Sequence, residues 1–305
     1  MSRRKVAQPW VFRSMLMTSA INPRRYRAAL HSGADVCTLD LEDAVPPARR
    51  AEARSRASQY FEGPSSIGPE CVRALRINSL RSTDGLLDVL ALAYGALKPD
   101  ALLIPKVDCA HDLRILEDML GDQRAEVDFL ATIETAAGLA AVEEIAIATP
   151  RVRGLVFGAA DFAADLGISM EWEPLLYARS RIVAAAAVAG IPAIDAPTFD
   201  LGTEMALKID VNRSRELGFG GKAAIHPRQV PVINEGFTPL PAEVDRARRV
   251  IDMADARSGQ LGVLDGQLVG PPMVAAAQRL LRRAKAVDTQ RRKPSGRPVR
   301  STVHY

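Results

Sequence analysis

Two carboxylates in this chain follow apolar runs at positions where they could bind a metal ion. Glu134 comes directly after the run Val127–Ile133. Asp161 comes shortly after the run Arg153–Gly158. Carboxylates without a neighbouring His/Cys cluster are hard oxygen ligands, which suit Mg²⁺ or Mn²⁺ better than Zn²⁺. The alternative for each acid is a surface carboxylate that caps the next helix. As a pair, Glu134 and Asp161 are predicted to hold Mg²⁺, with Mn²⁺ as a substitute.

Arg76 follows a third apolar run, Val72–Leu75. A guanidinium at such a position can grip a substrate carboxylate through two parallel hydrogen bonds. The alternative is a buried ion pair with Asp40 or Glu42. Both roles are compatible, because a positioned arginine usually needs an acidic neighbour.

Lys106 and His226 also follow apolar runs, and each stands next to a proline. A lysine here could form a Schiff base, which would mean metal-free aldolase chemistry. The acidic neighbours favour a salt-bridged structural lysine instead. For His226, a structural role is favoured over that of a general base.

The elements that must position these residues form a repeated strand–helix unit. The predicted strands lie near Val11–Met17, Asp35–Leu41, Cys71–Ile77, Ala101–Pro105, Val127–Ile133, Arg153–Gly158, Ile191–Asp195 and Gly221–His226. The predicted helices between them are Pro23–Ser32, Pro47–Tyr60, Thr83–Tyr94, Ala110–Leu120, Ala136–Ala148, Pro174–Ala189 and Thr203–Leu217. Eight such units predict an α/β fold of the (β/α)8 TIM-barrel type. No G-x-G-x-x-G follows the first run, which argues against a dinucleotide-binding sheet.

In such barrels the chemistry lies at the carboxyl ends of the strands. Most of the predicted strands end in charged or titratable residues, which are therefore predicted to converge on one face. These residues are Asp40, Glu42, Asp43, Arg76, Lys106, Glu134, Asp161, Asp195 and His226.

The barrel is predicted to occupy residues 11–236, after a flexible N-terminus at 1–10. Residues 237–288 are predicted to form a C-terminal helical extension and lid. That extension contains a helix near Pro239–Ser258, a hairpin-like segment at Gly259–Gly270 and a helix near Met273–Ala286. Residues 289–305 are predicted to be a basic, disordered tail.

Composition narrows the class of protein. The 305-residue chain has a net charge of +4, with much of the excess in its two ends. No aromatic residues interleave with those arginines, so nucleic-acid binding is not expected.

The separated cysteines Cys37, Cys71 and Cys109 fit a reducing compartment. No apolar run approaches the roughly 20 residues needed to span a bilayer, so a cytoplasmic protein without membrane contact is expected.

Short segments spread from Arg13 to Ala286 resemble the HpcH/HpaI aldolase and citrate lyase β-subunit family, especially its citrate lyase β-like and malyl-CoA lyase branch. The segments are Arg13-Ser14, Gly33-Ala34-Asp35, Leu39–Val45, Arg76-Ile77-Asn78, Ile104–Val107, Ile133-Glu134-Thr135, Gly158–Gly167 and Leu217–Pro227. Their order and spacing, rather than any one of them, carry the resemblance.

The resemblance implies a TIM barrel that assembles as a homotrimer or homohexamer. It implies Mg²⁺ on Glu134 and Asp161, with Arg76, Glu134 and Arg13 binding substrate. Three nearby acids are expected to support the metal and the arginine, namely Asp40, Glu42 and Asp43. The implied reaction is carbon–carbon cleavage or formation in a 3-hydroxyacyl-CoA thioester such as malyl-CoA or citramalyl-CoA, with glyoxylate or pyruvate as the oxo acid.

Two departures from the family pattern leave alternatives open. Ser19-Ala20 stands where members often carry Pro-Gly, and Gly270 stands where a lid acid is expected. Asp265 lies nearby, although Asp265-Gly266 is also typical of a hairpin turn. One alternative is an aldolase of the same family that acts on a free hydroxy-oxo acid. The other is a metal- and CoA-binding protein with little or no turnover.

Overall fold

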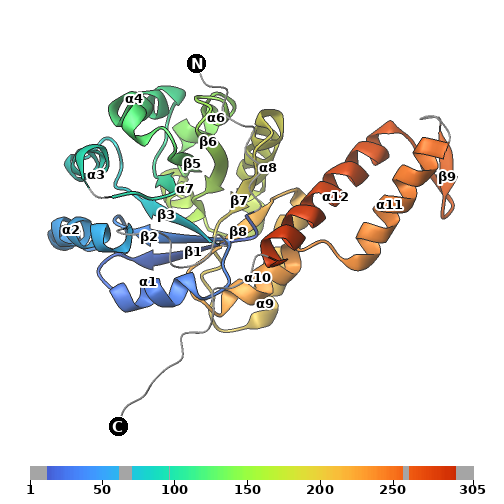
Figure 1. Cartoon of the computed structure of the whole chain (residues 1–305), viewed down its shortest axis with the longest axis horizontal. Helices are drawn as coiled ribbons and strands as arrows, with labels where there is room; N and C mark the ends of the chain where they lie inside the picture. The colour runs from blue at the N-terminus through green and yellow to red at the C-terminus, as the bar shows by residue number, and fades with distance from the viewer. Residues whose placement is uncertain (1–11, 62–70, 96, 257–260, 293–305) are drawn as a thin grey trace, which may run out of the picture.

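The computed structural model describes residues 12–61, 71–95, 97–256 and 261–292, and it contains a closed barrel (Figure 1). Eight parallel strands close the barrel in chain order, from β1 to β8. They are β1 Ser14–Ser19, β2 Val36–Asp40, β3 Val72–Arg76, β4 Ala101–Ile104, β5 Asp128–Ile133, β6 Val152–Phe157, β7 Ala193–Asp195 and β8 Gly221–Ala224. The predicted (β/α)8 fold is confirmed.

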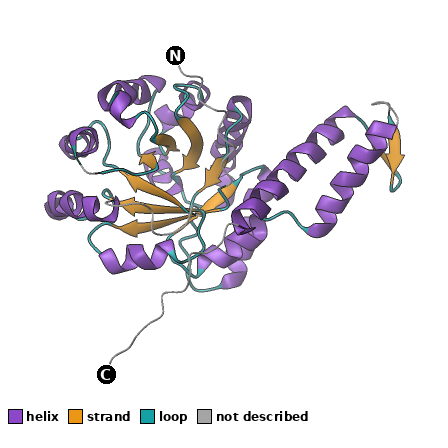
Figure 2. Cartoon of the chain, in the orientation of Figure 1, coloured by secondary structure: helices purple, strands orange, loops and turns teal. Residues whose placement is uncertain are grey.

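Helices surround the strands on the outside of the barrel (Figure 2). They are α1 Pro23–Leu30, α2 Arg50–Phe61, α3 Thr83–Tyr94, α4 Ala110–Leu120, α5 Ala136–Ala140, α6 Val142–Ala146, α7 Ala159–Leu166, α8 Trp172–Ala189, α9 Glu204–Leu217 and α10 Gln229–Phe237, with 3₁₀ turns at Pro47–Arg49 and Asp122–Arg124. The single helix predicted over Ala136–Ala148 is two short helices, because the backbone of Ala141 leaves the helical region. The sequence did not predict the short helices α7, which directly follows β6, and α10, which follows the loop after β8.

Successive side chains of a strand point to opposite sides of the barrel wall, so the strands contribute to two separate apolar layers. One set of residues fills the barrel interior, and it includes Met15, Val36, Leu130 and Val156. The residues between them face outward and join the larger core under the helices. A polar residue within a strand therefore points into the barrel only if it shares the parity of the interior set.

The C-terminal extension projects from the barrel as an arm (Figure 1). It consists of α11 Pro241–Ala256, the antiparallel hairpin β9 Gly262–Leu264 and β10 Gln267–Val269, and α12 Pro271–Arg292. The arm has a small core of its own, built on Ala247, Val250, Val269 and Ala277. Arg283 of α12 ties it to the barrel, donating hydrogen bonds to the carbonyls of Gly220 and Phe237 at 2.6 and 3.0 Å.

The predicted boundaries need one correction. Helix α12 continues to Arg292, so the predicted disordered tail does not begin at residue 289. Residues 1–10 and 293–305 lie outside the described residues. Whether the arm acts as a lid stays a prediction.

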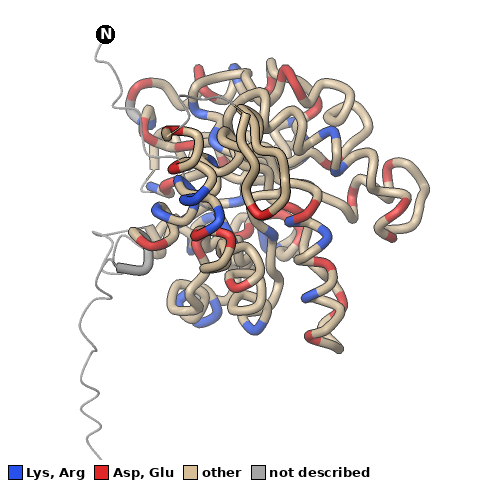
Figure 3. The backbone as a smooth tube through the Cα atoms, turned by 90° about the vertical axis from the view of Figure 1, so that its right-hand side faces the viewer, with Lys and Arg blue, Asp and Glu red and all other residues tan. Residues whose placement is uncertain are grey.

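Acidic and basic residues are interspersed on the side of the molecule seen in Figure 3. None of the helices in the described ranges has the length and apolar character needed to cross a membrane.

Candidate active site

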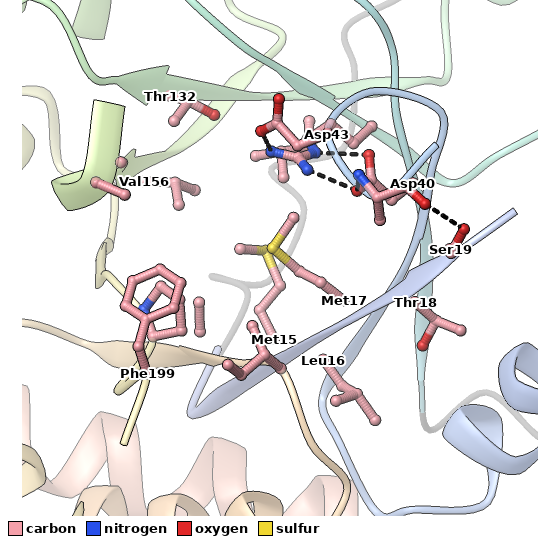
Figure 4. Close-up of a pocket in the computed structure, with 18 of the residues that line it drawn as sticks. Met15, Leu16, Met17, Thr18, Ser19, Asp40, Asp43, Thr132, Val156 and Phe199 are labelled. Atoms are coloured by element: carbon pink, nitrogen blue, oxygen red, sulfur yellow. Dashed lines mark hydrogen bonds and ion pairs between the residues drawn. The ribbon is translucent and has the colours of Figure 1, made fainter. Parts of the chain in front are cut away.

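A cavity of about 910 Å³ opens at the carboxyl ends of the barrel strands (Figure 4). One wall is polar and carries Asp40, Asp43, Arg76, Thr132, Glu134 and Asp161. The opposite wall is apolar and carries Met15, Met17, Val156, Pro197, Phe199 and Ile225. An apolar cavity with a few convergent polar groups is the usual form of a small-molecule site.

Glu134 follows β5 and turns inward to the cavity. Its side chain is almost fully buried, and its Oε1 accepts a hydrogen bond of 2.8 Å from the backbone N–H of Lys106. Lys106 adopts a left-handed backbone conformation, with φ of 52°, unusual for a residue other than glycine. A Cβ at Gly158 would lie 2.3 Å from Glu134 Oε2, so the carboxylate occupies space that only glycine leaves free.

Asp161 lies in the first turn of α7, which begins directly after β6. The Lys106 ammonium lies 4.0 Å from Glu134 Oε1 and also 4.0 Å from Asp161 Oδ2. It forms a closer ion pair of 2.7 Å with Glu42 Oε1. The two acids predicted as metal ligands thus flank a common position beside one cationic group.

The polar wall carries an excess of negative charge. Burial raises the pKa of Glu134 to about 8, and the nearby charges of Glu42 and Asp161 add to this effect. Burial also raises the pKa of Glu42, although Arg76 and Lys106 oppose the shift. These carboxylates, with Asp40 and Asp43, outnumber the two cationic side chains beside them. A further cation would therefore stabilise the cluster.

The donor set fits a hard divalent cation held by Glu134 and Asp161. Across the described residues, no three or more His, Cys, Asp and Glu side chains gather in a way that could by themselves hold a metal. Mg²⁺ does not require such a cluster, because it commonly binds one or two carboxylates and keeps water or substrate oxygens as its other ligands.

Arg76 is the last residue of β3, and its side chain lines the cavity. Nε and Nη2 donate to the two oxygens of Asp40 at 2.7 and 2.6 Å, and Nη1 donates to Asp43 at 2.9 Å. Nη1 also lies 3.3 Å from Glu42 Oε2. Since a guanidinium has five N–H groups, the three hydrogen bonds orient it and leave one N–H on Nη1, beside Glu42, and one on Nη2. The predicted ion pair is therefore present, and it leaves Arg76 able to bind a carboxylate.

Lys106 is the salt-bridged lysine that the sequence favoured. Burial lowers its pKa, but the hydrogen bond and charge of Glu42 outweigh this, so the pKa of Lys106 is raised overall. A lysine held in its charged form is a poor Schiff-base nucleophile. His226 lies at the cavity, and its Nδ1 accepts a hydrogen bond from the backbone N–H of Arg228 at 3.2 Å.

The prediction that Arg13 binds substrate is wrong. Arg13 precedes β1 and lies at the opposite end of the barrel from Glu134. Its Nη2 forms a buried ion pair of 2.7 Å with Asp35, which precedes β2, and its Nη1 donates to Thr238. This pair ties together the amino ends of neighbouring strands, which explains a buried arginine without any contact to substrate.

Asp195 does not join the cavity either. It ends β7, but its neighbour Ile194 faces the barrel interior, so Asp195 faces outward. There it pairs with Lys222 and Arg179, both at 3.0 Å, and the two positive charges keep the pKa of Asp195 low despite its burial. The prediction that Asp195 lies at the barrel mouth is therefore wrong, because alternation along β7 turns its side chain outward.

Several residues of the cavity were missed in the sequence. Thr132 lies two positions before Glu134 and shares its inward parity, so alternation along β5 could have identified it. Met17 and Phe199 form part of the apolar wall. Their apolar character alone does not distinguish them from core residues.

The sequence of this chain is similar to that of a known protein family. The model of the HpcH/HpaI aldolase/citrate lyase family matches residues 13–227, which is most of the chain. The chain belongs to this family. It is therefore a lyase of the HpcH/HpaI aldolase/citrate lyase type, as the short segments along its sequence predicted.

Individual relatives support the same assignment. The L-malyl-CoA/beta-methylmalyl-CoA lyase of Cereibacter sphaeroides is 34% identical over 90% of this chain and 95% of its own. RipC from Yersinia pestis is 42% identical, with a TM-score of 0.68 over 77% of this chain and 99% of its own. CitE from Mycobacterium tuberculosis, solved with magnesium, acetoacetate and coenzyme A, is 31% identical, with a TM-score of 0.74 over 89% of this chain and 97% of its own.

Proposed function

We propose that this protein is a Mg²⁺-dependent lyase that cleaves or forms a carbon–carbon bond in a 3-hydroxyacyl-CoA thioester such as malyl-CoA or citramalyl-CoA. The observation that carries this proposal is the meeting of Glu134, Asp161 and an oriented Arg76 in one cavity. The named activity of the Cereibacter relative and the magnesium, acetoacetate and coenzyme A bound by CitE support it.

Each group of the cavity has a place in this reaction. Glu134 and Asp161 hold Mg²⁺, which when bound supplies a Lewis acid for the oxygens of the oxo acid and for the charge that develops as the bond breaks. Arg76 holds the substrate carboxylate. Because Asp40 and Asp43 already orient the guanidinium, little conformational freedom is lost when the substrate binds. The apolar wall excludes water from the reacting carbons.

Two further features, one in the first loop and one in the hairpin of the C-terminal arm, favour a free hydroxy-oxo acid as the substrate. Ser19 donates a hydrogen bond of 2.7 Å to the carbonyl of Ala44, so the first loop is tied to the loop after β2. Asp265 is engaged in an ion pair of 2.8 Å with Arg249 and has the positive φ of a hairpin turn. Gly270 therefore has no substitute acid within its own hairpin. A homotrimer or homohexamer remains part of the proposal.

An assay of oxo-acid release tests the substrate class. Malyl-CoA and citramalyl-CoA are incubated with the protein in Mg²⁺ or in EDTA, and glyoxylate or pyruvate is measured. We expect release that EDTA abolishes. If neither thioester is cleaved but a free hydroxy-oxo acid is, the free-acid aldolase is correct. If Mg²⁺ and the oxo acids stabilise the protein without turnover of any substrate, it is a binding protein.

The raised pKa of Glu134 predicts how stability depends on pH when divalent cations are removed. Burial raises this pKa from 4.5 to about 8 on folding, so the folded state binds the extra proton between these values. Stability is then lost as the pH rises from 4.5 to about 8, because Glu134 ionises readily in the unfolded chain whereas the folded protein disfavours its charged form. In EDTA the melting temperature should fall over this range.

Added Mg²⁺ should reverse the loss, with a larger gain at pH 9 than at pH 6, because at the lower pH the metal must displace a proton. Melting curves at both pH values, with EDTA or excess Mg²⁺, provide the measurement. Glu134→Gln cannot ionise, so its curve in EDTA should depend less on pH. Equal pH dependence in this variant and the wild type would contradict the assignment.

A further inference from the structure

One buried hydroxyl in the cavity has no hydrogen-bond partner among the described residues. Thr132 is only 6% exposed and lines the cavity, yet its Oγ1 makes no hydrogen bond within the described part of the chain. A buried hydroxyl without a partner destabilises a protein, so such groups are uncommon and usually have a reason. A partner that arrives with a ligand is one such reason.

The position of Thr132 shows which ligand could supply that partner. Thr132 lies on β5 and Glu134 directly follows that strand, two residues later, so both side chains point to the same side. Val156, the neighbour of Thr132 on β6, is apolar and cannot accept or donate a hydrogen bond. In Figure 4 the Thr132 hydroxyl lies on the side that faces Asp43, away from Val156. The hydroxyl is thus directed toward the side of the cavity that carries Asp43 and its partner Arg76.

We infer that Thr132 is a substrate-binding residue whose hydroxyl forms a hydrogen bond with an oxygen of the oxo-acid part of the substrate. This inference rests on the proposed function. A small oxo acid with its carboxylate on Arg76 and its other oxygens near Glu134 lies over Thr132. Because the hydroxyl is already desolvated in the free protein, binding gains this hydrogen bond without a new desolvation penalty. Thr132 therefore selects for an oxygen-bearing group at this point of the cavity.

The unpaired hydroxyl makes the test unusually direct. Thr132→Val keeps the branched shape of the side chain and replaces the hydroxyl by a methyl group. We expect its melting temperature to equal or exceed that of the wild type, because no internal hydrogen bond is lost. Its affinity for pyruvate and glyoxylate in excess Mg²⁺ should fall by roughly 10- to 100-fold, as for a lost hydrogen bond to a charged group. Thr132→Ser, which keeps the hydroxyl, should bind these acids nearly as well as the wild type. Isothermal titration calorimetry measures the affinities.

The chain offers a matched control in Thr38. This residue lies on the inward parity of β2, is fully buried, and also has a hydroxyl without a partner among the described residues, but it does not line the cavity. Thr38→Val should therefore match Thr132→Val in stability and match the wild type in oxo-acid affinity. If Thr132→Val does not fold, Thr132→Ala compared with Thr132→Ser carries the same contrast.

The outcomes separate this inference from the proposed function. If the wild type binds pyruvate or glyoxylate and Thr132→Val binds them equally well, the role of Thr132 is overturned while the proposed function stands. A lower melting temperature with unchanged affinity would also overturn it, by showing a structural hydroxyl. If the wild type binds neither acid in Mg²⁺ and cleaves neither thioester, both the inference and the proposed function fail.

Discussion

Glu134→Gln and Asp161→Ala are each expected to abolish Mg²⁺-dependent carbon–carbon cleavage, with kcat falling by at least about 10³-fold. Each variant removes one of the two carboxylates that hold the metal, and the Lewis acid is lost with it. The fold should survive, because Gln can still accept the hydrogen bond from Lys106, and the Asp161 side chain is 43% exposed.

Metal affinity is the readout that distinguishes this role from a structural one. Mn²⁺ binding is measured by titration calorimetry in the absence of substrate, and it should be lost or greatly weakened in both variants. Asp165→Asn is the matched control. Asp165 lies in the same helix, α7, and accepts a hydrogen bond of 2.8 Å from the backbone N–H of Ala136, which Asn can also accept. Undiminished metal affinity in both single variants would show that Glu134 and Asp161 are not the ligands.

Arg76→Lys is expected to lower kcat/KM by roughly 10²- to 10⁴-fold, with much of the effect in KM. Lysine keeps the positive charge but lacks the planar fork, so it cannot bind Asp40 and a substrate carboxylate together in the observed geometry. Losing two hydrogen bonds between charged groups, at about 1.5–3 kcal/mol each, accounts for this range.

Steady-state kinetics with the cleaved thioester, together with oxo-acid binding, provide the measurement. Arg73→Lys is the control, because Arg73 lies on the same strand and pairs with Asp100 at 3.3 Å, near the opposite end of the barrel. Its kinetics should remain close to those of the wild type. A wild-type KM in Arg76→Lys would mean that the guanidinium serves only the ion pairs with Asp40 and Asp43.

Much of the fold could be predicted from local sequence patterns. Two helices, Thr83–Tyr94 and Ala110–Leu120, have the predicted bounds, because capping residues and an exit glycine mark their ends. The bounds of the predicted strands agree with the observed ones to within a few residues. A short apolar run between helices indicates a strand that is buried on both faces. The short helices α7 and α10 were missed, because little more than two turns carry too little periodicity to distinguish them from loops.

The order of strand ends along the chain also determined which residues could meet at the barrel mouth. Arg76, Glu134 and Asp161 were identified in this way, because all parallel strands of a barrel finish on one face. That argument needs only the sequence position of each residue relative to its strand.

Only the tertiary structure decided which of these side chains enter the cavity and what each one contacts. Asp195 faces outward because it has the other parity, and Arg13 closes the amino end of the barrel. The Thr132 hydroxyl has no hydrogen-bond partner among the described residues. The raised pKa of Glu134 likewise depends on Glu42 and Asp161, which lie far from it in sequence. Local patterns report the burial of a residue, whereas hydrogen-bond partners and electrostatic fields depend on distances between segments that become neighbours only when the barrel closes.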